Sequence, residues 1–172
     1  MPIYALGQQV PVIHPSAYVS PDAVLIGSVT IGAESSVWPG AVLRGDDGSI
    51  EVGDRTSIQD GAVLHTTPFW PTVVGNEVTV GHIAHLEACT VEDGALIGSG
   101  AVVLHRAVIG RQALVGAGAV VSGDTVVPPR AMALGVPARI REDAVDTEYV
   151  RHGMESYVKR AVRYREELRR ID

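Results

Sequence analysis

Four side chains that can bind a metal ion occur within a short stretch of this sequence. The segment VGHIAHLEACT, residues 80–90, carries His82, His85 and Glu87 among aliphatic residues, and His65 lies upstream of it. Imidazole nitrogen and carboxylate oxygen are ligands that zinc accepts, and three such protein ligands leave a fourth position open for water. The residues therefore predict a zinc site, provided that the fold brings them together.

The sequence around these residues repeats every six residues, and this repeat determines the fold that must position them. Aliphatic residues recur at this spacing, with a slip of three residues after Leu43, a break at a loop after Leu64 and one five-residue step after Leu86. Glycine often follows the aliphatic residue. Glycine disfavours helix, and its frequency here excludes a helical repeat. The repeated positions are Ile13, Val19, Leu25, Ile31, Val37, Leu43, Val52, Ile58, Leu64, Val74, Val80, Leu86, Val91, Ile97, Val103, Ile109, Val115 and Val121.

This hexapeptide repeat predicts an all-β parallel β-helix, in which three short strands form one coil of about 18 residues of a triangular prism. Alternation along each strand points the repeated aliphatic residue inward, and we expect the glycines to supply the turn geometry at the corners. The repeat predicts a β-helix domain over residues 1–140. The spacing alone does not determine the hand of the coil.

The pattern changes after Val136-Pro137, where apolar residues recur at steps of three and four. These steps predict an amphipathic helix over about 146–170, within a C-terminal segment, residues 141–172, that packs on the prism or on a neighbouring subunit. The apolar positions of this helix are Val150, Met154, Tyr157, Val158, Ala161, Val162 and Leu168.

The coil register decides which polar residues can meet. His65 and Glu87 each follow an equivalent inward position, so they should stack on one outer face, and strand alternation sends His85 to the same side as Glu87. His82 falls near a corner and is not expected to reach His65 within one prism. If three prisms associate around a threefold axis, His82 of one chain can face His65 of the next, which predicts metal sites between subunits.

Composition and charge narrow the class of protein. The chain has 172 residues, a net charge of −6 and a single cysteine, Cys89. One cysteine excludes an internal disulfide framework, and no segment is apolar for long enough to span a membrane. We expect a cytoplasmic protein with no membrane and no nucleic-acid partner, because the basic residues after position 150 fit a helix face. Cys89 should point into the prism, and His14, His105 and His152 should be surface or interface residues.

Three motifs together identify a family. Arg44-Gly45-Asp46, IQDGAVLH at 58–65 and VTVGH at 78–82 lie within the hexapeptide coils, and a helix follows the coils. Together they resemble the gamma-class carbonic anhydrase-like hexapeptide-repeat family over nearly the whole chain. The resemblance implies a left-handed β-helix and a homotrimer with zinc between subunits, with iron or cobalt as alternative metals.

The resemblance also implies roles for individual residues. His65 and His82 would be metal ligands, and Gln59 would lie near the metal-bound water. These residues would support a lyase reaction, the reversible hydration of carbon dioxide to bicarbonate by metal-bound hydroxide. The surrounding polar residues of the cleft would be Arg44, Asp46, Asp60 and Tyr157.

Position 87 departs from the family pattern, because Glu87 stands where a third histidine is expected and His85 comes two residues earlier. A carboxylate ligand leaves the metal centre with one positive charge fewer than an imidazole does, so the bound water is less acidic and weak activity is expected. Stacking favours Glu87 as the third ligand, whereas ligand chemistry favours His85. The sequence leaves both open.

Two other functions are compatible with the same repeat. GVPAR at 135–139 resembles the ends of hexapeptide acyltransferases, which use acyl-coenzyme A, although no long inserted loop is present to build a slot for the pantetheine arm. A non-catalytic trimeric scaffold or binding protein with an altered metal site is the other alternative. Metal content and coenzyme A binding discriminate between the two enzymes, and a comparison with His82→Ala tests the scaffold.

Overall fold

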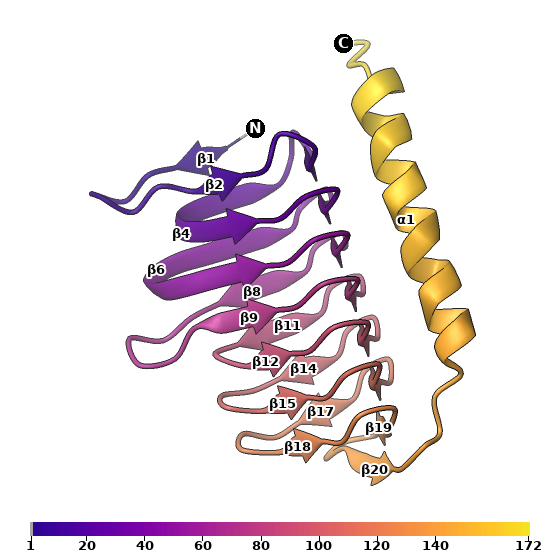
Figure 1. Ribbon diagram of the computed structural model, residues 1–172. Helices are drawn as coiled ribbons and strands as arrows, with labels where there is room; N and C mark the ends of the chain where they lie inside the picture. Colours follow the sequence, from indigo (N-terminus) through magenta and orange to yellow (C-terminus); the bar gives the residue numbers. More distant parts are fainter. Residues whose placement is uncertain (1) are drawn as a thin grey trace.

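The computed structural model describes residues 2–172, which form a prism of stacked parallel strands with one helix along its side (Figure 1). Each strand pairs with its equivalents in the coils before and after it, and the register keeps the repeated aliphatic residues above one another. The expected left-handed parallel β-helix followed by a helix is confirmed.

The prism has three faces, and the first two belong to one sheet because two long strands turn the corner between them. The first face consists of β1 (Ile3–Tyr4), the first halves of β4 (Val24–Ile31) and β6 (Val42–Val52), β8 (Val63–His65), β11 (His85–Glu87), β14 (Val102–Val103) and β17 (Val120–Val121). The second face consists of β2 (Val12–Ile13), the second halves of β4 and β6, β9 (Thr72–Val74), β12 (Thr90–Val91), β15 (Val108–Ile109) and β18 (Val126–Val127).

The third face is a separate sheet, and it is the one that the helix covers. A short antiparallel pairing of its last two strands ends the prism. The strands of this face are β3 (Tyr18–Val19), β5 (Ser36–Val37), β7 (Ser57–Ile58), β10 (Thr79–Val80), β13 (Leu96–Ile97), β16 (Leu114–Val115), β19 (Met132–Leu134) and β20 (Arg139–Arg141).

The repeated aliphatic residues fill the interior, as the sequence predicts. The positions from Leu25 to Val121 are buried, whereas Ile13 and Val19 of the first coil are only partly buried. Alanines two positions before many of them complete one continuous apolar core along the prism axis. Because each coil covers the next, the core is stabilised by nearest-neighbour stacking.

The glycines that follow the aliphatic residues do not have the role expected from the sequence. Gly53 and Gly98 lie outside the left-handed region of φ, so they do not supply the turn geometry. A Cβ atom on Gly98 would lie 2.5 Å from the backbone nitrogen of Ala117 in the next coil. The expectation was wrong because what these positions require is the absence of a side chain between closely stacked coils.

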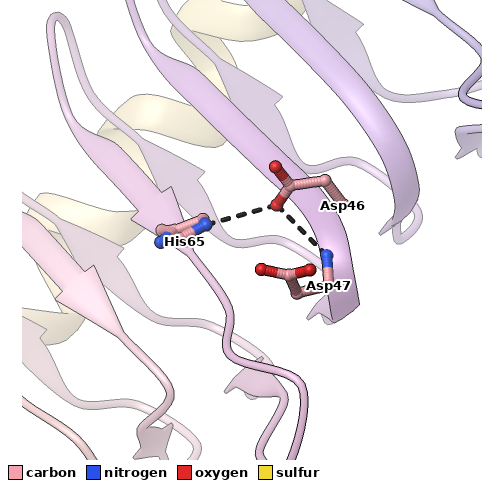
Figure 2. Close-up of side chains that lie close together, drawn as sticks. All are labelled: Asp46, Asp47 and His65. Atoms are coloured by element: carbon pink, nitrogen blue, oxygen red, sulfur yellow. Dashed lines mark hydrogen bonds and ion pairs between the residues drawn. The ribbon is translucent and has the colours of Figure 1, made fainter.

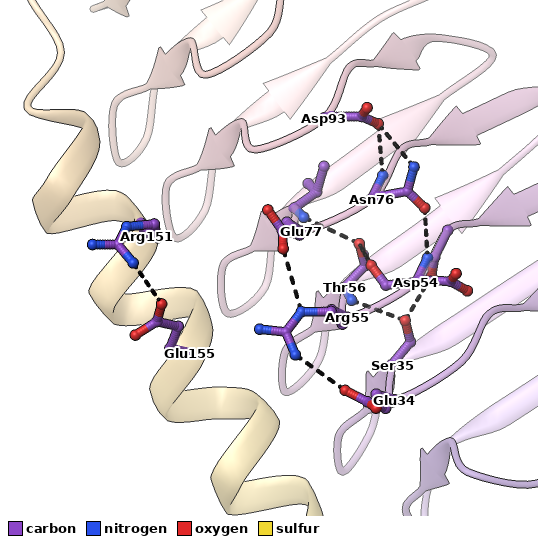
Figure 3. Close-up of polar contacts among 12 residues, drawn as sticks. Glu34, Ser35, Asp54, Arg55, Thr56, Asn76, Glu77, Asp93, Arg151 and Glu155 are labelled. Carbon is purple, nitrogen blue, oxygen red and sulfur yellow. Dashed lines mark hydrogen bonds and ion pairs between the residues drawn. The ribbon is translucent and has the colours of Figure 1, made fainter.

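Charged residues occupy several corners where φ is positive. Glu34, Arg55 and Glu77 have φ of 55°, 54° and 57° in successive coils. Arg55 Nη1 lies 3.1 Å from Glu34 Oε2, and Arg55 Nε lies 3.3 Å from Glu77 Oε1 (Figure 3). Exposed ion pairs of this kind each contribute less than about 1 kcal/mol. They show that this corner of the prism accepts long side chains in a conformation that usually favours glycine.

A ladder of short polar side chains runs beside these ion pairs. Asn76 Oδ1 accepts a hydrogen bond from the backbone N–H of Asp54 at 2.9 Å, and Asp93 Oδ1 accepts one from the backbone N–H of Asn76 at 2.9 Å (Figure 3). Each side chain therefore satisfies a backbone donor of the coil beside it.

The helix α1 (Thr147–Glu167) begins one residue after and ends three residues before the expected bounds. Asp146 caps it, because its side chain accepts a hydrogen bond from the backbone N–H of Tyr149 at 3.1 Å. Of the expected apolar stripe, Val150, Met154 and Ala161 are buried. Its other positions are more open, and Val162 is 42% exposed.

An aromatic cluster fixes α1 on the third face of the prism. The ring of Trp38 packs edge-on against Tyr157 and Tyr164 of the helix, with centroids 5.5 and 5.0 Å apart. Nearer its end, Arg165 donates a hydrogen bond to the carbonyl of Ser16 in the first coil at 2.9 Å. The helix thus runs back along the coils towards the N-terminal end of the prism (Figure 1).

The helices within residues 2–172 include none that is long and apolar enough to cross a membrane.

Candidate metal centre

The first face of the prism presents a column of three polar side chains. Arg44, His65 and Glu87 occupy the same register position on β6, β8 and β11. The residues immediately before them point inward and are fully buried, so strand alternation turns these three side chains outward. The predicted stacking of His65 and Glu87 is confirmed.

A local expansion of β6 brings two further carboxylates to His65. Gly45 pairs with Gly27 and Ile50 pairs with Val29, so residues 46–49 of β6 lie opposite a single residue of β4. Asp46 Oδ1 lies 3.2 Å from His65 Nε2, and Figure 2 shows Asp47 beside the same imidazole. The ligand atoms of Asp46, Asp47 and His65 all lie within 4.8 Å of one another.

The carboxylate of Asp46 remains ionised in this setting. Burial alone would raise its pKa, but the ion pair with Arg44 and hydrogen bonds from its own backbone and from His65 lower the pKa below its ordinary value. Arg44, Asp46 and His65 therefore form one connected polar group.

Glu87 is surrounded by imidazoles. Its Oε1 lies 3.3 Å from His65 Nδ1 and 3.4 Å from His105 Nε2, and its Oε2 lies 3.2 Å from His85 Nε2. Burial would raise the pKa of Glu87, but the neighbouring imidazoles of His85, His105 and His65 lower it overall. The carboxylate is therefore available as an anionic ligand at neutral pH.

His105 is the member of this group that the sequence reasoning missed. It was expected to be a surface or interface residue, because the repeat indicated no partner for it. His105 follows Glu87 by one coil length of 18 residues, and this spacing is the signal that could have found it. The five-residue step after Leu86 obscured the relation by shifting the frame between the two positions.

The remaining predicted site residues form a second group on another part of the prism. Asp60 Oδ2 lies 2.8 Å from His82 Nδ1, and the hydroxyl of Tyr157 in α1 lies 3.5 Å from His82 Nε2. Gln59 is buried nearby, and Gln59, His82 and Tyr157 line one cleft of about 560 Å³ between α1 and the third face.

The two groups do not meet within one chain. Among residues 2–172, no hydrogen bond or ion pair connects the group of His65 with the group of His82. The first group is on strands of the first face, whereas the second lies after β7 and β10 of the third face. One chain therefore presents two partial sites, each containing one of the two histidines implied as ligands.

The backbone beside His82 is unusual. Gly40, Gly61 and Gly100 turn the equivalent corners of neighbouring coils with φ between 68° and 71°, but Ile83 takes this place with φ of 53°. A β-branched residue is strongly disfavoured in the left-handed region. Its side chain is 69% exposed, so little burial compensates for the strain.

Replacing Ile83 by glycine is therefore expected to stabilise the chain. The left-handed conformation costs a residue with a side chain roughly 1–2 kcal/mol, and the greater freedom of unfolded glycine offsets about 0.5–1 kcal/mol of the gain. Chemical denaturation should show a net increase of about 0.5 kcal/mol or more in the free energy of unfolding. Val126→Gly, at an exposed strand position, should instead lower it, and a loss of stability in Ile83→Gly would contradict the strain argument.

Cys89 plays no part in either group. It is buried in the core, as expected, and burial raises the pKa of its thiol to about 12. At neutral pH it is a protonated, unreactive side chain.

Comparisons with known proteins show to which family this chain belongs. A model of bacterial transferase hexapeptide repeats (six repeats) matches residues 88–123. The probable carbonic anhydrase of Methanocaldococcus jannaschii is 42% identical over 152 residues, which cover 88% of this chain and 92% of that protein. Gamma carbonic anhydrase 1, mitochondrial, of Arabidopsis thaliana is 40% identical over 144 residues, covering 80% of this chain and 52% of that protein. The chain belongs to the gamma carbonic anhydrase-like hexapeptide-repeat family.

Members of this family and related hexapeptide proteins share the fold closely. A solved structure from Bacillus cereus, provisionally described as an acetyltransferase, is 35% identical with a TM-score of 0.94, covering 96% of this chain and 98% of that chain. The chain spans only 52% and 57% of the length of two Arabidopsis gamma carbonic anhydrases that it matches.

Proposed function

We propose that this protein is a metal-dependent enzyme that hydrates carbon dioxide to bicarbonate at sites between the subunits of a homotrimer. The observation that carries the proposal is the division of the site residues into two groups on different parts of the prism. His65 stands among carboxylates on the first face, and His82 stands with Asp60 and Tyr157 beside the third. In a chain of this family, two such partial sites are complementary if a second copy supplies the missing half.

The donor set fits a zinc ion. His65 offers an imidazole nitrogen and Glu87 a carboxylate oxygen on one chain, and His82 of a neighbouring chain would add a second imidazole. Nitrogen and oxygen donors of this kind suit zinc in catalytic sites, with a position left for water. Iron and cobalt accept the same donors, and metal analysis of the purified protein distinguishes them.

The contacts of His82 prepare it for such a role. The carboxylate of Asp60 lies 2.8 Å from His82 Nδ1, where it can hold the tautomer protonated at Nδ1 and direct the Nε2 lone pair towards a metal. The hydroxyl of Tyr157 lies next to that nitrogen and helps to orient the ring. On the other face, the cation of Arg44 keeps Asp46 ionised, so that Asp46 can accept a hydrogen bond at the mouth of the site.

The remaining steps follow from the polar residues of the cleft. A metal ion bound there would supply Lewis acidity, which makes a water molecule a nucleophile at neutral pH. The amide of Gln59 is buried at the cleft and can orient that water or the incoming carbon dioxide. Hydration releases one proton per bicarbonate formed, and the cleft opens to solvent buffer that can accept it.

Metal analysis and a carbon dioxide hydration assay test the proposal together. The purified trimer should contain about one zinc per chain and hydrate carbon dioxide faster than the uncatalysed reaction, and His82→Ala should lose both properties. A zinc-loaded protein no faster than His82→Ala would indicate a non-catalytic trimeric scaffold instead.

The cleft beneath α1 favours acyl transfer as a second candidate function. Its volume of about 560 Å³ is in the range that binds organic ligands, which is more space than carbon dioxide needs. Leu96 and Leu114 contribute an apolar wall, and His82 could act as a general base. Binding of acetyl-coenzyme A by metal-free protein would favour this alternative. A zinc-loaded protein that does not bind acetyl-coenzyme A would reject it.

A further inference from the structure

The carboxylate of Glu87 has neighbours on both of its oxygen atoms. His85 Nε2 lies 3.2 Å from Oε2, while His105 Nε2 and His65 Nδ1 lie 3.4 and 3.3 Å from Oε1. The three imidazoles come from different places: His65 from the coil before, His85 from the same strand, and His105 from the coil after. Imidazoles of one chain therefore approach Glu87 from three directions.

His105 is poised towards Glu87 but is not fully engaged. Its Nε2 atom is buried and has no partner with hydrogen-bond geometry among residues 2–172, although Glu87 Oε1 is within ion-pair distance. A buried nitrogen without a partner costs free energy, so a small rotation of either side chain towards the other is favoured. The rest of the ring is accessible, with 44% of the side chain exposed.

Donors on a ligating carboxylate have two effects. They fix the rotamer of the carboxylate, and they withdraw negative charge from its oxygens. Both effects matter at position 87, where a carboxylate would otherwise leave the metal centre with a lower positive charge than an imidazole does. Two imidazole donors on Glu87 reduce that difference.

We infer that His85 and His105 are positioning residues that hold the Glu87 carboxylate as the third metal ligand. The inference rests on the proposed metal site, and it decides between the two ligands that the sequence leaves open. His85 acts through Glu87, because its Nε2 atom points at Glu87 Oε2. Glu87, which stands where the family has a histidine, then acts together with His85 and His105 as one ligand and its two supports.

Metal affinity of the trimer, measured by competition with a chelator, tests this role without relying on activity. His85→Ala and His105→Ala should each bind zinc about 10- to 100-fold more weakly, which is the usual effect of removing a partner of a metal ligand. His85→Gln and His105→Gln should recover part of the loss, because an amide N–H can still donate to the carboxylate. His14→Ala is the matched control, since His14 bonds to Ser16 in the first coil and should leave the affinity unchanged.

The visible spectrum of the cobalt-substituted protein provides a second readout. His105→Ala should shift the cobalt bands, because a released carboxylate changes its coordination, while thermal unfolding confirms that the variant is folded. Affinity and spectrum like those of wild type in both alanine variants would overturn the inference. A loss in His85→Ala as complete as that in His65→Ala would make His85 the ligand and overturn it as well.

Two benchmark variants separate this inference from the proposed function. His65→Ala and Glu87→Ala should lose zinc almost completely if the site exists. If they do and the His85 and His105 variants do not, the positioning role alone fails. A wild-type trimer that binds no zinc, cobalt or iron would end both proposals.

Discussion

Mixed trimers of His65→Ala and His82→Ala chains are expected to regain activity that neither variant has alone. If His65 and His82 of each site come from different chains, a ring with both variants contains one junction where an intact His65 faces an intact His82. Roughly one site in three is then complete, so trimers containing both chains should show about a third of the wild-type zinc content and carbon dioxide hydration. The expectation follows from the division of the site into two groups.

Co-expression of the two variants with different affinity tags allows trimers containing both chains to be purified. The control pairs His65→Ala with Glu87→Ala, which lie on the same face and damage the same half of the site. Trimers of that pair should remain inactive, because every chain lacks either His65 or Glu87 and no site receives both from one chain. If the His65→Ala and His82→Ala trimers also remained inactive while wild-type trimers were active, the two histidines would not belong to sites between subunits.

Gly98→Ala is expected to be among the most destabilising single-methyl additions in the chain. The new Cβ atom would lie 2.5 Å from the nitrogen of Ala117 and 2.7 Å from the carbonyl carbon of Gly116. Both are backbone atoms of the next coil, so the coils themselves must separate. We expect the free energy of unfolding to fall by about 3 kcal/mol, the upper part of the range for overpacked sites.

Gly153→Ala is the matched control, because it adds the same methyl group with the opposite result. Gly153 lies within α1, and a Cβ atom there would meet nothing within 4 Å. Replacing an unhindered helical glycine should raise stability by about 0.5–1 kcal/mol. Urea unfolding of both variants measures the difference, and equal stabilities would show that close coil approach is not what position 98 requires.

Much of the fold could be predicted from the sequence because aliphatic residues recur at a spacing of six. The six-residue period identifies the inward positions, so the burial of Leu64 and Leu86 and the stacking of His65 on Glu87 could both be predicted. The change to steps of three and four residues likewise predicted α1. Local periodicity is a reliable signal where every coil repeats the same environment.

The parts that could not be predicted are those where the repeat is interrupted. The sequence revealed a slip after Leu43, but only the structure shows that residues 46–49 bulge from β6 and carry Asp46 to His65. The five-residue step after Leu86 concealed His105 in the same way. The glycines were misread because composition cannot distinguish a residue that turns the chain from one that allows a close neighbour.

The helix α1 also changes how the prism should come apart. A stack of coils joined only to their neighbours can fray from either end, one coil at a time. Here the chain leaves the last coil, returns along the side and is bonded at Ser16 to the first. Peeling away the first coil must therefore also loosen the helix, which couples the two ends and favours all-or-none unfolding over gradual unravelling.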